Sequence, residues 1–216
     1  MKVTDLTHMI HTEMPVYPGT ERPVLQKANT LEKDGFQEAK ITMYSHTGTH
    51  IDAPAHMLRD GLYLDDFKID QFIGKALILD FSKINVPLVE LDNLRPYEEK
   101  IRKVDFIILR TGWSNYWGED KYYENFPTLS EESAQWLSEF ALKGIGIDAI
   151  SIDGMNTDTF AIHKMFLGKN ILIIENLTNL ESIGQESFIL SIMPLKTKNA
   201  DGSPVRAFSI EDWDDF

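Results

Sequence analysis

Five apolar runs, each about as long as a β-strand, constrain the fold of this chain more than any other feature. They lie at residues 76–81, 104–109, 145–152, 171–174 and 188–193. Half-exposed strands alternate apolar and polar residues, whereas buried strands are apolar throughout. The runs therefore predict a sheet that helices cover on at least one face.

A helix is predicted between two of these runs, over residues 130–143. Ser130 is its expected N-cap, and glutamates occupy the first turn, where they favour the positive end of the helix dipole. Lys143 and Gly144 mark its expected end. The apolar side chains at helical spacing are predicted to face the core: Trp136, Leu137, Phe140 and Ala141.

Two further elements complete the predicted order. Residues 159–167 favour a helix that Gly168 ends, and residues 36–44 alternate so that Ala39, Ile41 and Met43 share one face of a strand. Strands that alternate with helices predict an α/β architecture. The extra strands near both ends of the chain favour a mixed sheet with flanking helices over a simple doubly wound fold.

The size and composition of the chain fit one globular domain over residues 1–216. Hydrophobic residues make up 43% of the chain, and no repeat, low-complexity tract or linker interrupts it. The chain has no cysteine, which excludes disulfides and thiolate ligands and leaves His, Asp and Glu to bind any transition metal. The lack of cysteine also fits a cytoplasmic protein.

The charge balance argues against nucleic acids and membranes as partners. There are 21 Lys and Arg against 34 Asp and Glu, so the formal charge of −13 opposes phosphates and anionic lipids. The first residues, M-K-V-T-D-L-T-H, contain no apolar run of signal-peptide length, and the longest apolar stretches are only strand-sized. We expect neither secretion nor membrane insertion.

The segment H-T-G-T-H-I-D-A-P-A-H, residues 46–56, concentrates groups that bind metals. A lone histidine is usually a surface or core residue, and two histidines four residues apart often arise by chance. Asp52, two residues after His50, favours a metal site over these ordinary explanations, because positions i and i+2 of an extended segment point to one side. Gly48 lets the backbone bring His46 to the same place. Nitrogen and carboxylate ligands without sulfur are typical of a catalytic divalent ion.

This segment resembles the H-x-G-T-H-x-D-x-P-x-H signature of the cyclase family of metal-dependent hydrolases, which includes kynurenine formamidases (arylformamidases) and isatin hydrolases. Every fixed position of the signature is filled. Other segments similar to the family are P-V-Y-P-G (15–19), L-R-T-G (109–112), G-I-D-A-I-S-I-D (146–153), H-K-M-F-L-G (163–168), I-I-E-N (173–176) and D-G-S-P-V-R (201–206).

The resemblance implies the swivelling β/β/α fold and hydrolysis of a C–N bond in an amide, formamide or lactam. It also implies one or two divalent ions, Zn or Mn, and a homo-oligomer, most simply a dimer. The implied substrate is a small aromatic or planar molecule.

The family pattern implies that His46, His50 and Asp52 bind one ion, while Asp52, His163 and Glu175 bind a second. From the residues alone, His163 is equally well explained as a buried structural histidine. Glu175 follows four aliphatic residues, where a carboxylate is costly to bury without a positive partner. A bound divalent ion lowers the pKa of its water towards about 7, so water becomes reactive at neutral pH.

Such a reaction needs a group that carries protons, and His56 is the candidate. An imidazole with a pKa near 6.5 takes a proton from water and returns it to a leaving amine. The resemblance supplies most of the preference for this role, and a ligand or an orienting role for His56 stays open.

The substrate pocket is less well marked in the sequence. Tyr17 and Trp113 are candidates to flank a planar substrate, although aromatic residues beside turns are more often packing residues. Kynurenine formamidases typically have W-P-G where this chain has Tyr17-Pro-Gly, which weakens the case for formylkynurenine as the substrate. His8 and His11 are expected to be structural or surface residues.

Two other functions are compatible with parts of the pattern. A non-heme iron oxygenase would use His50, Asp52 and His163 as a triad of two histidines and one carboxylate. Its common scaffold is an all-β barrel, which the predicted helices disfavour, and it leaves His46, His56 and Glu175 without roles. A non-catalytic metal protein would require a closed coordination shell.

Overall fold

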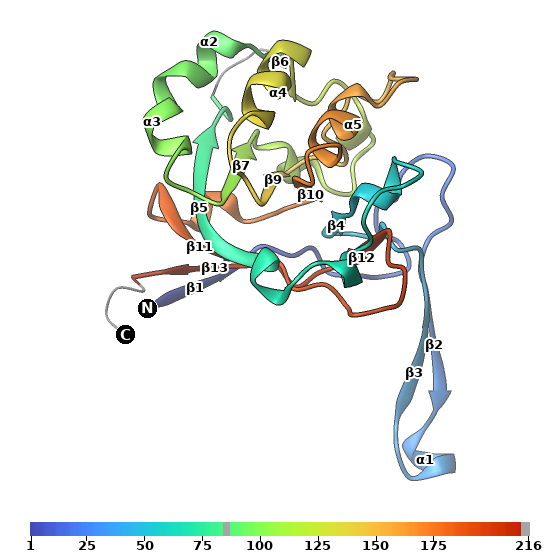
Figure 1. Cartoon of the computed structure of the whole chain (residues 1–216). Helices are drawn as coiled ribbons and strands as arrows, with labels where there is room; N and C mark the ends of the chain where they lie inside the picture. Colours follow the sequence, from blue (N-terminus) through green and yellow to red (C-terminus); the bar gives the residue numbers. More distant parts are fainter. Residues whose placement is uncertain (84–86, 213–216) are drawn as a thin grey trace.

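The computed structural model describes residues 1–83 and 87–212, and within these ranges a nine-stranded mixed sheet forms the centre of the chain (Figure 1). The strand order is β1-β13-β11-β5-β7-β9-β10-β4-β12. The bounds of its strands are β1 (Lys2–Asp5), β4 (His50–Asp52), β5 (Ile73–Asp80), β7 (Phe106–Arg110), β9 (Gly144–Ile147), β10 (Leu172–Glu175), β11 (Ser187–Ser191), β12 (Gly202–Pro204) and β13 (Phe208–Glu211).

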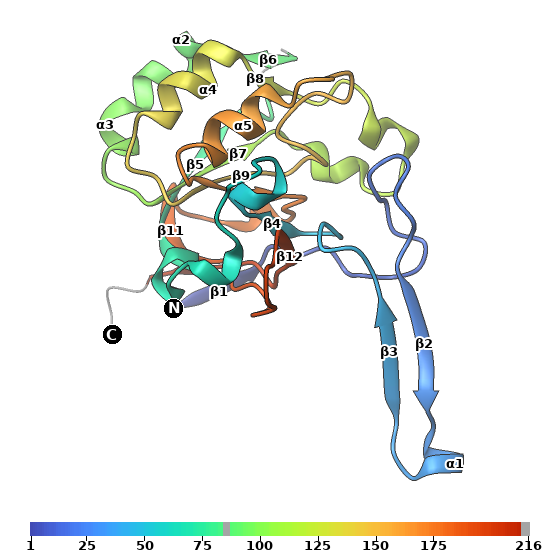
Figure 2. The same ribbon diagram turned by 45° about the vertical axis from the view of Figure 1, so that its right-hand side comes forward.

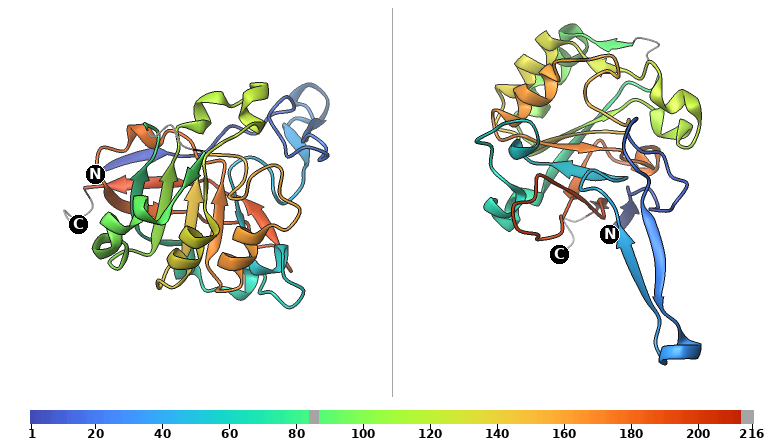
Figure 3. Two further views of the ribbon diagram at one scale, coloured as in Figure 1. Left: turned by 90° about the horizontal axis from the view of Figure 1, so that it is seen from above. Right: turned by 90° about the vertical axis from the view of Figure 1, so that its right-hand side faces the viewer.

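Helices cover one face of this sheet, as the view from above shows (Figure 3). They are α2 (Leu91–Leu94), α3 (Glu98–Ile101), α4 (Glu131–Ser138) and α5 (Ala161–Leu167). The neighbours β5, β7, β9 and β10 run parallel, and the strands on either side of them pair antiparallel. A short parallel pair, β6 (Leu88–Val89) with β8 (Thr128–Leu129), lies apart from the main sheet. The predicted α/β fold with a mixed sheet and flanking helices is confirmed.

Alternate residues of the central strands enter two separate hydrophobic clusters. On β7, Ile107 and Leu109 pack with the helices, whereas Phe106 and Ile108 pack on the opposite face of the sheet. All four are essentially inaccessible to solvent. Burial on both faces explains why the sequences of these strands are mainly apolar.

The helix predicted over residues 130–143 is shorter than expected. Ser130 is its N-cap, accepting a hydrogen bond from the amide of Ser133, but α4 ends at Ser138. The amide of Lys143 donates to the carbonyl of Asp105 (2.7 Å), so the chain must leave the helix to enter the sheet. Ala141, predicted to face the core, is consequently exposed.

The strand predicted over residues 145–152 is also shorter, because β9 ends at Ile147. Asp148 turns its carboxylate to the amides of Thr111 and Gly112, at 2.7 and 2.8 Å. The following residues leave the sheet and form part of a pocket wall.

A hairpin arm projects from the body of the molecule (Figure 2). It consists of β2 (Val24–Asn29), α1 (Leu31–Asp34) at the tip and β3 (Glu38–Thr42). A strand within residues 36–44 is thus confirmed, and Ala39 and Ile41 on its apolar face are exposed. Elsewhere, no helix within the described ranges has the length and apolarity to cross a membrane.

Candidate metal and active site

The centre of the site is β4, which lies between β10 and β12 and runs antiparallel to both. His50 and Asp52 project from one face of this strand, and Ile51 between them is fully buried on the other. The strand register places Glu175 opposite His50 and Gly202 opposite Asp52. Adjacent strands therefore bring together acidic and imidazole groups that are far apart in the sequence.

The remaining histidines of the 46–56 segment lie beside this strand. His46 precedes it, and its Nδ1 lies 2.7 Å from Asp52 Oδ1. His56 ends a short 3-10 helix, Pro54–His56, and its ring centroid lies 3.8 Å from that of His46. The Nδ1 atom of His56 is 4.0 Å from the carboxylate of Asp201, which also lies 3.2 Å from His46 Nε2.

Two backbone or side-chain acceptors orient the buried histidines. The Nδ1 of His50 lies 2.7 Å from the carbonyl of Gly48, and the Nδ1 of His163 lies 2.6 Å from Asp153 Oδ2. An imidazole that donates from Nδ1 keeps a free electron pair on Nε2, the usual arrangement of a histidine ligand. The Nε2 atoms of both rings face the Glu175 carboxylate, at 3.5 Å for His50 and 3.2 Å for His163.

Asp52 lies at the centre of these groups. It is fully buried, and among the described residues its Oδ2 has no hydrogen-bond partner. The donor atoms of His46, Asp52 and His56 lie within 4.8 Å of one another, as do those of His50, Asp52 and Glu175. A buried carboxylate oxygen without a partner, shared by two groups of nitrogen and oxygen donors, fits a divalent cation.

The charges of His46 and Asp52 depend on each other. Burial opposes protonation of His46, but Asp52 and Asp201 outweigh burial and raise the pKa of His46 to about 9. Burial likewise opposes ionisation of Asp52, yet His46 and His50 hold its pKa well below the usual range. Without a cation, the protonated His46 ring thus balances the neighbouring carboxylates, and a bound cation would take its place.

The other two histidines behave in opposite ways. For His163, burial is outweighed by Asp153 and Glu175, which raise its pKa to about 10. For His56, burial is the largest influence and lowers the pKa below the ordinary value. His56 is therefore uncharged at neutral pH and ready to accept a proton.

A cavity of about 420 Å³ opens over this cluster. Its wall includes all of the predicted histidines and Glu175, together with Tyr17, Phe160 and Asp201. Burial raises the pKa of the Tyr17 hydroxyl, with Glu175 and Asp153 adding to the effect.

Trp113, the other aromatic candidate, does not belong to the lining of this cavity. Its indole N–H donates to the carbonyl of Tyr122 at 3.2 Å, and its ring packs against the helix-side core. His8 stacks on Trp117 with ring centroids 3.8 Å apart, and His11 is exposed. Trp113 and His8 are thus packing residues and His11 is a surface residue.

Sequence reasoning missed three residues that shape the site: Asp153, Asp201 and Gly202. Asp153 ends an apolar run just as Glu175 does, so the same argument about buried carboxylates could have identified it. Asp201 and Gly202 begin the family-like segment 201–206, but nothing in the sequence of that segment assigns either residue to the site. Their proximity to His46 depends on the pairing of β12 with β4, which the local sequence does not reveal.

Comparisons with known proteins agree with this architecture. Residues 4–154 match the Cyclase family model, described as "Putative cyclase". The chain is 32% identical over 205 residues to a kynurenine formamidase of Bacillus cytotoxicus, covering 94% of each chain, and 31% identical to one of Geobacillus thermodenitrificans, again covering 94% of each.

Solved structures show the same fold. Isatin hydrolase A from Ralstonia solanacearum has a TM-score of 0.86 at 24% identity, covering 96% of this chain and 91% of that one. A potential metal-dependent hydrolase with cyclase activity has a TM-score of 0.81 at 28% identity, covering 96% of both chains. The swivelling β/β/α fold is thereby confirmed, and an all-β barrel is excluded. The family match over most of the chain and the shared fold lead to one conclusion: this chain belongs to the cyclase family of metal-dependent hydrolases.

Proposed function

We propose that this protein is a metal-dependent hydrolase that cleaves a C–N bond of an amide, formamide or lactam in a small aromatic or planar molecule. The observation that carries the proposal is the buried Asp52 carboxylate, with one unpartnered oxygen, at the meeting point of four histidines and Glu175. The kynurenine formamidase relatives support the choice of a formamide or a related amide.

We assign His46, His50 and Asp52 to one ion, and Asp52, His163 and Glu175 to a second. Asp52 is the natural bridge, because it belongs to both groups whose donor atoms lie within 4.8 Å of one another, His46 with Asp52 and His56, and His50 with Asp52 and Glu175. Zn and Mn both suit this set of imidazole and carboxylate donors, and a single-ion site is the alternative. When bound, the ion supplies Lewis-acid activation of water and of the amide carbonyl.

The chain itself supplies the proton transfer. His56 is uncharged at neutral pH because burial lowers its pKa, and it lies in the cavity wall beside His46. Its Nδ1 faces Asp201, so its Nε2 accepts the proton from the attacking water. The same nitrogen returns that proton to the leaving amine as the C–N bond breaks, which balances the hydrolysis.

The cavity holds a small planar substrate. Tyr17 and Phe160 stand in its wall with the histidines, and its volume of about 420 Å³ suits a one- or two-ring molecule.

A hydrolysis screen with metal analysis tests this function. Purified protein is assayed by elemental analysis and with N-formylkynurenine, isatin and simple aryl formamides as substrates. We expect one or two ions per chain and hydrolysis of at least one substrate. Asp52→Ala should lose both the ions and the activity. Full metal content in that variant would disprove the ligand assignment, and a metal-loaded protein inactive on the whole panel would disprove the reaction.

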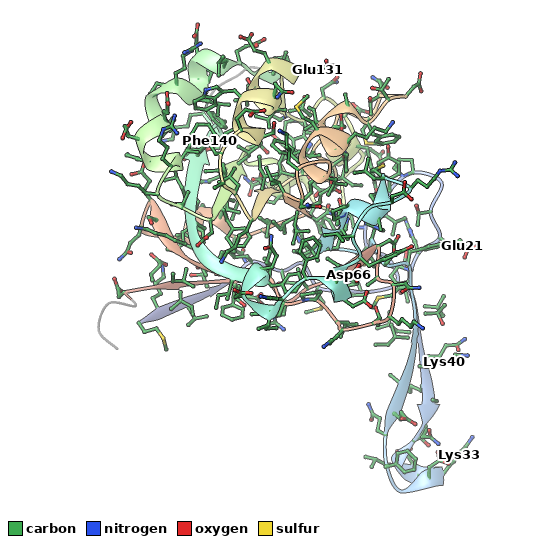
Figure 4. The ribbon with its side chains drawn as sticks, viewed as in Figure 1. Glu21, Lys33, Lys40, Asp66, Glu131 and Phe140 are labelled. Atoms are coloured by element: carbon green, nitrogen blue, oxygen red, sulfur yellow. The ribbon has the colours of Figure 1, made fainter. Side chains whose placement is uncertain are left out.

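We also propose that the protein is a homodimer in which each hairpin arm binds a second copy of the chain. A two-stranded hairpin alone is only marginally stable in water, so this arm needs a partner. Figure 4 shows Lys33 at its tip and Lys40 along β3, both clear of the body. The apolar side chains that it exposes are Val24, Leu25, Leu31, Phe36 and Ile41.

The charge of the arm favours a second copy as the partner. Residues 24–42 contain three lysines and three acidic residues, so the arm is neutral, whereas the whole chain carries −13. A neutral apolar arm can contact an acidic body without the repulsion that two acidic surfaces would meet. Both ends of the arm continue into the cavity wall, at residues 15–20 and 44–46, so the interface would lie beside the active site. A cytoplasmic location stays a prediction.

A further inference from the structure

Asn176, directly after Glu175, occupies an unusual position beside the site. It is buried and adopts a left-handed backbone conformation with φ of 57°. Each of its four polar groups is engaged. The amide N–H donates to Ala149 (2.9 Å), and the carbonyl accepts from the Thr49 hydroxyl (2.6 Å). The side chain contacts Gly48 and Tyr122.

The side-chain amide of Asn176 shares an acceptor with a candidate metal ligand. Its Nδ2 donates to the carbonyl of Gly48 at 2.9 Å, and the same carbonyl faces His50 Nδ1 at 2.7 Å. A carbonyl oxygen has two lone pairs and can accept both bonds. The position of this carbonyl therefore decides how the ring of His50 is turned and which of its nitrogens carries the proton.

The hydrogen-bond partners of the Asn176 side-chain amide fix its orientation. The Gly48 carbonyl can only accept, so the NH₂ group must face it and Oδ1 must face Tyr122, whose hydroxyl donates at 2.7 Å. Tyr122 is completely buried, and burial, with Asp148 and Glu175, raises its pKa well above 10, which keeps the hydroxyl protonated. A continuous chain of hydrogen bonds thus runs from Tyr122 through Asn176 and Gly48 to His50.

We propose that Asn176, held by Tyr122, is a positioning residue for the metal site. It fixes His50 with the proton on Nδ1, so that Nε2 is free and lies 3.3 Å from Asp52 and 3.5 Å from Glu175. The inference rests on the proposed role of His50 as a ligand. Partners that orient ligands in this way typically contribute about 10- to 100-fold to metal affinity.

The test uses Asn176→Asp, which is nearly isosteric and also tolerates the left-handed conformation. It keeps an acceptor for Tyr122 but loses the donor to Gly48. The matched control is Asn179→Asp, because Asn179 has a similar φ of 55° but its Nδ2 donates to Asp5, and it is exposed. Tyr122→Phe provides a second variant that removes only a hydroxyl, in case Asn176→Asp does not fold.

Two readouts that do not depend on hydrolysis decide the result. In metal-free protein, ¹⁵N NMR of labelled histidine reports the tautomer of His50, and competition with a chromophoric chelator gives Zn²⁺ affinity. We expect the Nδ1–H tautomer in the wild type and the control. Asn176→Asp should show a mixture of tautomers and an affinity about 10- to 100-fold weaker. Tyr122→Phe should change both readouts in the same direction by less.

An unchanged tautomer and unchanged affinity in Asn176→Asp, or in Tyr122→Phe if only that variant folds, would overturn the inference. An equal loss of affinity in Asn179→Asp would also overturn it, because the effect would then be general. If the affinity changes as expected but the wild type hydrolyses no amide, the positioning role stands and the proposed reaction fails.

Discussion

At the scale of single residues, His56 allows proton transfer to be separated from metal binding. Its ring lies in the cavity wall, and the proposed ligand set does not include it. His56→Ala should therefore keep its metal and lose roughly 10²- to 10⁴-fold in turnover, the usual contribution of a placed acid or base. Turnover of a responsive substrate and metal content are measured on the same sample. Loss of the metal would make His56 a ligand, and near-normal turnover would remove it from the mechanism.

Gly202 determines where the ring of His46 can lie. A Cβ at this position would come within 2.4 Å of His46 Cε1, well inside van der Waals contact. Gly202→Ala should push the ring away from Asp52 and weaken metal binding by roughly 10- to 100-fold. Gly154→Ala is the control, because a Cβ there meets no heavy atom within 4 Å. Equal affinities in the two variants, measured by chelator competition, would show that His46 does not hold the ion.

Asp148 provides a test of stability against pH. Burial raises the pKa of its carboxyl to about 6, although Thr111 and Gly112 donate hydrogen bonds to it. The folded protein therefore keeps a proton that the unfolded chain loses near pH 4, so the free energy of unfolding falls as pH rises from about 4 to 6. The whole effect is roughly 3 kcal/mol.

Asp148→Asn cannot ionise and should lack this decrease. Urea unfolding at several pH values gives the measurement, as the difference in unfolding free energy between variant and wild type. That difference should move in favour of the variant by roughly 3 kcal/mol between pH 4 and pH 7. Parallel curves of unfolding free energy against pH for the variant and the wild type would show that the carboxyl of Asp148 has an ordinary pKa.

At the scale of elements, the hairpin arm gives the clearest prediction. If the arm binds a second copy, polar residues at its apolar tip should weaken the dimer without disturbing the body. We expect the wild type to sediment as a dimer at micromolar concentration and Leu31→Ser/Phe36→Ser to shift towards monomer. Lys33→Ser, also on α1 at the tip, is the control. A monomeric wild type, or a tip variant as dimeric as the wild type, would contradict the proposal.

The helices and strands also show how much of the fold could be predicted from the sequence. All five apolar runs became strands, because strands buried on both faces have a signature that lies entirely within themselves. The predicted ends of α4 and β9 were wrong because hydrogen bonds to residues distant in the sequence set the actual ends. The partner is Asp105 in the first case and Thr111 in the second. Alternation predicted β3 as a strand, but alternation alone does not show whether the apolar face of a strand packs in the core or is exposed, as Ala39 and Ile41 are. The single domain over residues 1–216 stays a prediction.

At the scale of the whole molecule, metal binding should contribute to stability. An ion that binds only the folded state adds about 2.7 kcal/mol at a free concentration 100 times its Kd. For a chain of this size, that corresponds to an increase in Tm of about 5 to 10 °C. Calorimetry of chelator-treated protein, titrated with Zn or Mn, measures the shift. Asp52→Ala should show none, and a wild-type Tm independent of metal would argue against a site formed by folding.

The position of β4 in the sheet has a consequence for biosynthesis. Its two neighbours, β10 and β12, both come much later in the sequence, and β12 supplies the glycine against which the His46 ring lies. A chain still emerging from the ribosome displays the histidines of residues 46–56 long before Glu175 or Gly202 exists to receive them. The proposed set of ligands is therefore complete only after translation has passed residue 204, and the nascent chain offers competing metals only a loose, incomplete set of donors.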